Sequence, residues 1–151
     1  MTIELEKDIA TGPDFVHKLS TRLGMEGNRG RTERIIRKVL HILRERLTIE
    51  ESMQVIAQLP IVLKGWYVHG WSPDHKKSRS KTIGDLAREI ALEDRAARCG
   101  DFYGQGEVIL AIRAFMETLA DGGFPGEIEE MIDVMPPDLK HLMASWLLRY
   151  R

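Results

Sequence analysis

The chain has 151 residues, of which 43% are hydrophobic and 30% are charged. This balance is typical of a folded, water-soluble domain and excludes a disordered chain. No apolar run approaches the roughly 20 residues of a membrane span, and the acidic start MTIELEKDIATG does not resemble a signal peptide. The single cysteine cannot form an internal disulfide, so we expect a cytoplasmic protein.

The net charge of −1 hides an uneven distribution along the chain. Residues 1–81 contain fifteen Lys and Arg against ten Asp and Glu, a balance of +5, whereas residues 82–151 contain seven against thirteen, a balance of −6. A basic half can bind nucleic acid, but oppositely charged halves can also attract each other within one chain or between two chains. We favour this second explanation because the acidic half would repel a phosphate backbone.

The first predicted helices cover residues 13–47. Residues 1–12 are expected to form a loosely held tail, because Pro13 suits the first position of a helix. A glycine-rich loop at residues 24–30 precedes a longer helix, for which Thr32 is the expected N-cap. Apolar side chains on a 3.6-residue period predict that this helix runs to residue 47 and buries one face. The expected buried set is Ile35, Ile36, Val39, Leu40, Ile42, Leu43 and Leu47.

A pair of helices divided by a proline follows at residues 48–71. Thr48 and Glu51 have the spacing of a capping box, in which each side chain bonds to the backbone N–H of the other residue. Pro60 ends the first helix and suits the start of the second, which Gly70 is expected to end. Three aromatic residues gather near that end: Trp66, Tyr67 and Trp71.

The second half repeats this order after a polar linker at residues 72–81. Thr82 is the expected N-cap of a helix that ends near residue 100. The Asp85 carboxylate is placed to accept a hydrogen bond from the Thr82 backbone N–H. Further helices are predicted at residues 107–119, 127–135 and 138–150, and the prolines at 136 and 137 divide the last two. No segment alternates like a β-strand, so we predict an all-α fold of about eight helices.

Matching positions in the two halves indicate an internal repeat. At an offset of 76 residues, Ile56, Leu59, Pro60, Leu63 and Lys64 match Ile132, Met135, Pro136, Leu139 and Lys140. We therefore predict one compact all-α domain over residues 1–151, built from two pseudo-repeated four-helix units. Unit one covers about residues 13–71, residues 72–81 form the linker, and unit two covers about residues 82–151.

The sequence also resembles a known family. The shared features are the apolar faces of the helices, the proline between two helices and the aromatic residues after it. In the first half the residues concerned are Val39–Leu40, Leu43–Leu47, Ala57–Pro60, Leu63, Gly65, Tyr67, Gly70 and Trp71. In the second half they are Gly126–Glu129, Met135–Pro136 and Leu139–Lys140. On these residues the chain resembles a bacterial family catalogued as domain of unknown function 2267, over residues 15–143. It departs from the family pattern at Met135, where a leucine is usual, and at the extra Phe124–Pro125.

The resemblance implies an all-helical bacterial protein and identifies no catalytic residues. Independently of the resemblance, the residue patterns predict no catalytic, cofactor or metal site. The five histidines lack the His-x-x-x-His spacing and the Cys/His pairing of a zinc site, and Cys99 has no paired histidine. The glycine-rich loop before Arg31 lacks the ending of a P-loop. We therefore expect an interaction or structural module and not an enzyme.

The predicted interaction surface combines basic and aromatic residues. Its members are Arg31, Arg34, Arg37, Lys38, Trp66, Tyr67, Trp71, Lys76, Lys77 and Arg79. Trp and Tyr often anchor protein interfaces, so binding of an unidentified protein or self-association is the favoured function. One alternative is nucleic-acid binding by the basic residues, although no aromatic residues interleave them. A second alternative is a small-ligand pocket or active site between the units, which needs at least two converging charged or histidine side chains.

Overall fold

The computed structural model describes residues 2–72, 74, 82–122 and 125–148, with side chains described from residue 12 onward except at 125–127. Within these ranges the chain forms eight α-helices and no strand, which confirms the predicted all-α class. They are α1 (Thr2–Arg22), α2 (Arg29–Glu45), α3 (Ile49–Gln58), α4 (Ile61–Val68), α5 (Ile83–Ala96), α6 (Gln105–Asp121), α7 (Pro125–Asp133) and α8 (Pro137–Trp146). No helix in the described ranges is both long enough and apolar enough to cross a membrane.

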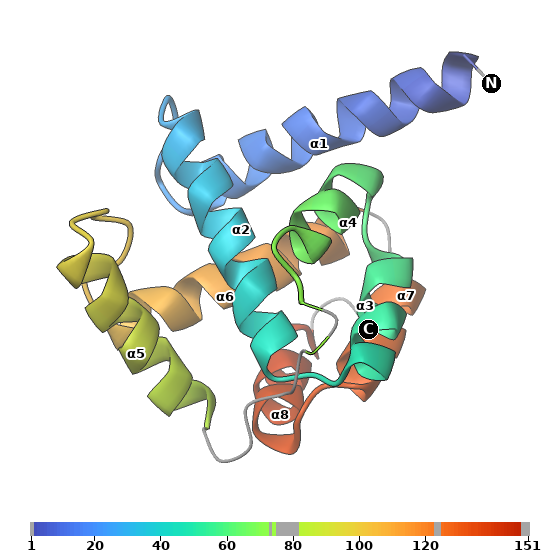
Figure 1. Cartoon of the computed structure of the whole chain (residues 1–151). Helices are drawn as coiled ribbons and strands as arrows, with labels where there is room; N and C mark the ends of the chain where they lie inside the picture. Colours follow the sequence, from blue (N-terminus) through green and yellow to red (C-terminus); the bar gives the residue numbers. More distant parts are fainter. Residues whose placement is uncertain (1, 73, 75–81, 123–124, 149–151) are drawn as a thin grey trace.

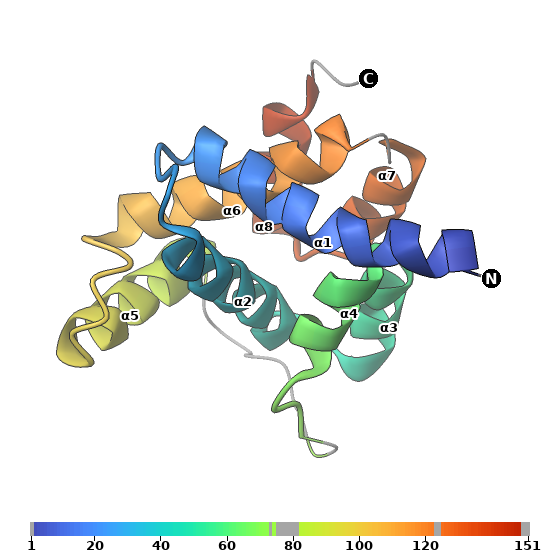
Figure 2. The same cartoon turned by 90° about the horizontal axis from the view of Figure 1, so that it is seen from above.

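The helix α6 is the centre of the fold. It contacts α1, α2, α5, α7 and α8, and its second half is buried on nearly every side. A helix that is apolar all round can be stable in water only when other helices surround it. Figure 1 shows α2 crossing in front of α6, and in both views α5 lies beside the first turns of α6 (Figures 1 and 2). The helix α6 therefore carries the packing contacts that position α2 and α5.

The remaining helices cover the other flank of α6. The helix α3 packs beside α7, and Gln58 donates a hydrogen bond of 2.8 Å to Glu130 between them. The helix α1 lies across α2, α4 and α6, while its N-terminal turns project past the other helices in both views (Figures 1 and 2). The seven apolar residues of the predicted stripe are all buried, but the helix ends at Glu45 instead of residue 47, so Leu47 lies just beyond it.

The prediction of a loose tail before Pro13 was wrong. The helix α1 begins at Thr2 and continues through Pro13, although proline removes one backbone hydrogen bond from a helix interior. Packing against α4 explains the difference: a Cβ added at Gly12 would lie 2.9 Å from Val62 Cγ2, so the two helices approach closely at this turn. Contacts between helices thus outweigh the local preference for a helix start.

The predicted N-cap of α2 was also wrong by one turn. The helix begins at Arg29, and the side chain of Asn28 accepts a hydrogen bond of 3.3 Å from the Arg31 backbone N–H. Thr32 lies inside the helix, is fully buried, and donates from Oγ1 to the Asn28 carbonyl at 3.1 Å. Asn and Thr are both favourable N-cap residues, and in this helix Asn28 is the N-cap instead of Thr32.

Other helix ends agree closely with the predictions. Thr48 and Glu51 form both bonds of the capping box, at 2.9 and 3.1 Å, and Thr82 Oγ1 accepts from the Asp85 N–H at 3.1 Å. Gly70 follows the end of α4 with a φ of +70°, the left-handed conformation that glycine adopts easily. The boundaries of α6, α7 and α8 differ from the predicted ones by one to four residues, because helix ends carry the weakest sequence signals.

Two prolines precede short helices with similar backbone angles. Pro60 is the N-cap of α4 with φ −57° and ψ 153°, and Pro136 is the N-cap of α8 with φ −56° and ψ 150°. Each proline carbonyl accepts the first bond of its helix, from Lys64 at 3.0 Å and from Lys140 at 2.8 Å. Pro60 therefore precedes the helix by one position and does not occupy the first helical position that the sequence suggested.

Ion pairs join the basic first half to the acidic second half. Arg46 donates two hydrogen bonds of 3.3 and 2.8 Å to Asp138, which also accepts the Ile83 N–H at 2.8 Å. Burial alone would raise the pKa of Asp138, but the bonds from Arg46 and from the backbone lower it overall. Arg22 of α1 likewise pairs with Asp121 of α6. The attraction predicted from the charge distribution therefore acts within one chain.

Candidate binding groove

Three basic side chains of the predicted interaction surface form hydrogen bonds with other residues of the same chain. Arg34 donates hydrogen bonds of 3.2 and 2.9 Å to the two carboxylate oxygens of Asp101. Lys38 Nζ lies 2.6 Å from the Asp101 carboxylate and 2.8 Å from that of Asp94. Arg31 donates to the Asp101 backbone carbonyl at 3.2 Å. We call these five residues the ionic cluster; it ties α2 to the last turn of α5 and to the loop that follows.

The two carboxylates of the ionic cluster are buried and keep their charge. Asp94 is 4% exposed and also accepts the backbone N–H groups of Asp101 and Phe102, each at 2.9 Å. Burial alone would raise the pKa of both aspartates, but hydrogen bonds from Lys38, and from Arg34 to Asp101, lower both pKa values overall. These anions balance much of the positive charge at the start of α2, which weighs against the nucleic-acid alternative.

The aromatic residues of the predicted surface lie at the end of α4. Tyr67 is fully buried, with its hydroxyl 2.6 Å from Ser52 Oγ, and burial raises the pKa of Tyr67 to about 12. Trp71 packs edge-on against Tyr67 with ring centroids 5.9 Å apart. Trp66 is half-buried, and the Arg37 guanidinium lies 4.9 Å from the centre of its ring. Tyr67 therefore belongs to the core, whereas Trp66 and Arg37 form a small surface contact of their own.

Two side chains of α2 hold this end of α4 in place. Arg44 is buried and donates from Nη1 to the carbonyls of Tyr67 and His69 at 2.7 and 2.9 Å. His41 Nε2 donates to the carbonyl of Trp66 at 2.9 Å, and burial lowers the pKa of His41. The last carbonyls of a helix have no partners within it, so these bonds satisfy groups that would otherwise need water.

The structure thus separates the predicted surface into distinct groups. Arg31, Arg34 and Lys38 belong to the ionic cluster, while Arg37, Trp66, Tyr67 and Trp71 surround the end of α4. Lys76, Lys77 and Arg79 lie outside the described residues.

A groove of about 580 Å³ lies between α2 and α5, one helix from each predicted unit. The groove is present because α5 packs against α6, which leaves the side of α5 that faces α2 open. Its floor is apolar: Ile42 and Leu86 are buried, and Ile90 is partly buried against the core. This volume is within the range of about 300–1,000 Å³ found for ligand sites. We call it the α2–α5 groove.

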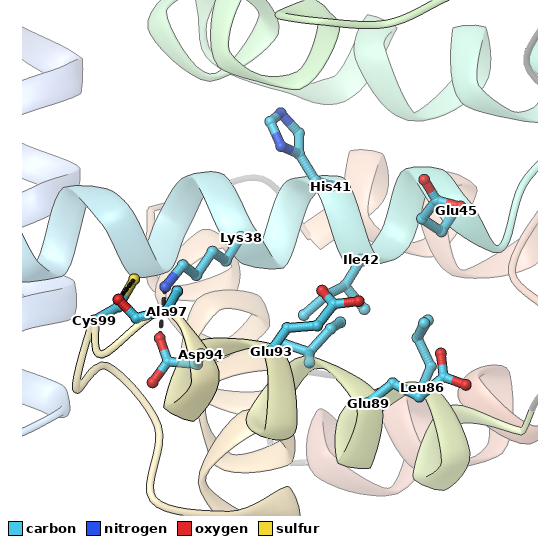
Figure 3. Close-up of a pocket in the computed structure, with 11 residues that line it drawn as sticks. Lys38, His41, Ile42, Glu45, Leu86, Glu89, Glu93, Asp94, Ala97 and Cys99 are labelled. Atoms are coloured by element: carbon cyan, nitrogen blue, oxygen red, sulfur yellow. Dashed lines mark hydrogen bonds and ion pairs between the residues drawn. The ribbon is translucent and has the colours of Figure 1, made fainter.

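Acidic side chains line both walls of the α2–α5 groove. Glu45 comes from α2, and Glu89 and Glu93 come from α5. Figure 3 shows Glu93 reaching toward α2 beside Ile42, and Lys38 extending toward Asp94 at the other end of the groove. A ligand site between the two predicted units needs at least two converging charged side chains, and the groove meets this requirement. Among the described residues, no group of three or more His, Cys, Asp or Glu side chains is arranged to hold a metal ion.

Asp94, Asp101 and the glutamates of the groove were not among the residues predicted from the sequence. Glu89 and Glu93 are four residues apart, so their common face on a helix could have been read from the spacing. Asp101 follows Cys99 and Gly100 in a loop and has no periodic signal. Its role depends on contact with α2 residues more than 60 positions earlier in the chain.

Eight helices, with α6 at their centre and an open groove between α2 and α5, define a small all-helical protein. The chain belongs to the family described as uncharacterized conserved protein, DUF2267, whose model matches residues 13–142. This match confirms the resemblance found in the sequence. No curated protein matches the chain.

Proposed function

We propose that this protein is a cytoplasmic protein-interaction module that binds a partner protein in the α2–α5 groove and does not catalyse a reaction. The observation that carries the proposal is the groove itself, an open recess between two helices with exposed glutamates at its rim and the partly buried Ile90 on its floor. Burying apolar surface is the main driving force for protein association, and exposed apolar recesses rimmed by polar groups are typical of interaction sites.

The charges around the groove support binding over catalysis. His41 lines the groove, but its Nε2 is already bonded to the Trp66 carbonyl. Lys38 is shared between two buried carboxylates of the ionic cluster. A general base or nucleophile needs a free position and a partner that activates it, and these two groups are engaged in holding helices together.

We further propose that residues 13–71 and 82–151 are two copies of one four-helix unit within a single domain. The equal backbone angles at Pro60 and Pro136 support this proposal. So does the burial of the residues around them, because Leu63 and Leu139 are both fully buried three positions later. On this proposal the groove lies between the second helix of the first unit and the first helix of the second, so it forms only when the two units pack together.

The proposal can be tested with a photo-crosslinker attached to Cys99, the single cysteine of the chain, which is exposed and lines the groove. The control carries the same crosslinker at Glu26→Cys in a Cys99→Ser background, since residue 26 is exposed and outside the groove. Proteins from the native host that crosslink from position 99 and not from position 26 are identified by mass spectrometry. They are then purified and their affinity for the protein is measured.

Two matched variants decide whether the apolar floor is the binding surface. Ile90→Ala shortens a partly buried side chain in the groove, and Ile109→Ala does the same on α6 outside it. The proposal predicts that Ile90→Ala weakens partner binding about tenfold, since losing a buried methylene-rich side chain costs 1 kcal/mol or more, whereas Ile109→Ala leaves it unchanged. Equal binding by both variants, or no crosslink specific to position 99, would refute it.

A further inference from the structure

We propose that the α2–α5 groove recognises a basic amphipathic helix of the partner protein. This inference rests on the function proposed above for the same groove and names the chemistry of its occupant. Two features of the groove carry it: the sign of the charges on its walls, and the spacing of the apolar side chains on its floor.

The walls of the groove favour a cationic occupant. Glu45 of α2 and Glu93 of α5 are both exposed and line the groove, and Figure 3 shows Glu93 reaching toward α2 beside Ile42. Among the described lining residues the one lysine, Lys38, is already matched by Asp94 and Asp101. A recess lined by one sign of charge attracts ligands of the opposite sign and repels those of its own. Lysine or arginine side chains of a partner would therefore meet Glu45 and Glu93 at the rim.

The floor of the groove favours a helical occupant. Leu86 and Ile90 are one turn apart on α5, and Ile42 faces them from α2. Glu89 and Glu93 repeat the same one-turn spacing beside them. Two neighbouring helices with apolar residues between rows of charge form the surface onto which a third helix packs. The described part of the chain has no strand, so it offers no sheet edge to which an extended peptide could add.

The probes are three fluorescein-labelled peptides of 18 residues, and binding to the full chain is measured by fluorescence anisotropy. The first has leucines on one helical face and lysines on the other. The second keeps the leucines and replaces every lysine by glutamate, and the third has the composition of the first in a scrambled order. We expect the first peptide to bind at least tenfold more tightly than either of the others at 50 mM salt.

Charge reversal in the groove tests where the first peptide binds. The variant Glu45→Lys/Glu93→Lys changes two exposed glutamates that line the groove, and the control Glu26→Lys/Glu129→Lys changes two exposed glutamates outside it. Each reversal adds two charges, so both double variants have a formal net charge of +3 instead of −1. The groove variant is expected to bind at least tenfold more weakly than the control at 50 mM salt. The difference is expected to shrink at 500 mM salt, because exposed charges are screened.

The outcomes separate this inference from the proposed function. If the identified partner loses affinity with Ile90→Ala but not with Glu45→Lys/Glu93→Lys, the groove binds proteins but does not select a basic helix, and the inference is overturned. Equal binding of the lysine and glutamate peptides, or no binding of the lysine peptide, also overturns it. Light scattering that shows a dimer abolished by Ile90→Ala would assign the groove to a second copy of the chain instead.

Discussion

Replacing Asp101 by asparagine tests the ionic cluster most sharply, because the change preserves the shape of the side chain and removes its charge. The Asp101 side chain is fully buried and accepts two hydrogen bonds from Arg34 and one from Lys38. An asparagine offers one acceptor oxygen and an NH₂ group that faces cations. At least one of the three charge-assisted bonds is therefore replaced by a contact between two donors.

The expected loss of stability can be worked out from the exposure of the partners. A hydrogen bond to a charged group contributes about 1.5–3 kcal/mol, and leaving a buried charge without its partner costs about 3–5 kcal/mol. The full cost does not apply, since the Arg34 and Lys38 side chains are 52% and 29% exposed and can turn toward water. We expect Asp101→Asn to lower the free energy of unfolding by about 2 kcal/mol, and Tm by about 4–8 °C.

Urea denaturation at pH 7, followed by circular dichroism, measures this loss. The control is Asp133→Asn, which removes an exposed carboxylate 3.8 Å from Lys140 and is expected to have no measurable effect. The reasoning also predicts the pH dependence. Because the pKa of Asp101 is lowered on folding, its stabilisation is complete above about pH 5 and is lost as the pH falls below the ordinary value of about 3.9. A loss no larger than that of Asp133→Asn, or one that stays constant from pH 5 to pH 3, would refute the account of the cluster.

Two further predictions concern packing and buried polar groups, and urea denaturation measures both. Gly12→Ala is expected to destabilise the protein by about 1 kcal/mol, because the overlap of the new methyl group with Val62 outweighs the better helix propensity of alanine. At Gly65 an added Cβ meets no atom within 4 Å, so Gly65→Ala is expected to stabilise the protein by about 0.5–1 kcal/mol. The same sign for both glycines would contradict the close contact between α1 and α4. Ser52→Ala is expected to cost about 1–3 kcal/mol by leaving the buried Tyr67 hydroxyl without its partner. Adding Tyr67→Phe to that variant is expected to recover part of the loss, and no recovery would show that Ser52 acts through packing.

The sequence predicts most of the fold because helix periodicity and caps are local signals. The seven apolar residues of the α2 stripe are all buried, and the capping box at Thr48 is formed as expected. The error at Pro13 has a tertiary cause, since the sequence contains the proline but not the contact between Gly12 and Val62 that holds the helix there. Local rules identify a helix and locate its ends only when no other element overrides them.

The candidate site was harder to predict because it depends on relative placement. The sequence reveals that Arg34 and Lys38 are basic, but not that they face Asp101, so three cations assigned to an open surface are bound within the chain. The groove results from α5 packing on α6 and away from α2, and no residue pattern encodes that gap. The charge imbalance between the halves was a long-range signal, and it pointed to attraction between them.

The most direct test of the central claim is a map of amide chemical-shift changes in the ¹⁵N-labelled chain as the lysine peptide is added. The account predicts that the shifted amides gather along residues 38–45 of α2 and 86–97 of α5, and that Glu45→Lys/Glu93→Lys abolishes them. Shifts gathered at Arg29 and Arg37 on the basic side of α2, or spread evenly over the eight helices, would contradict it.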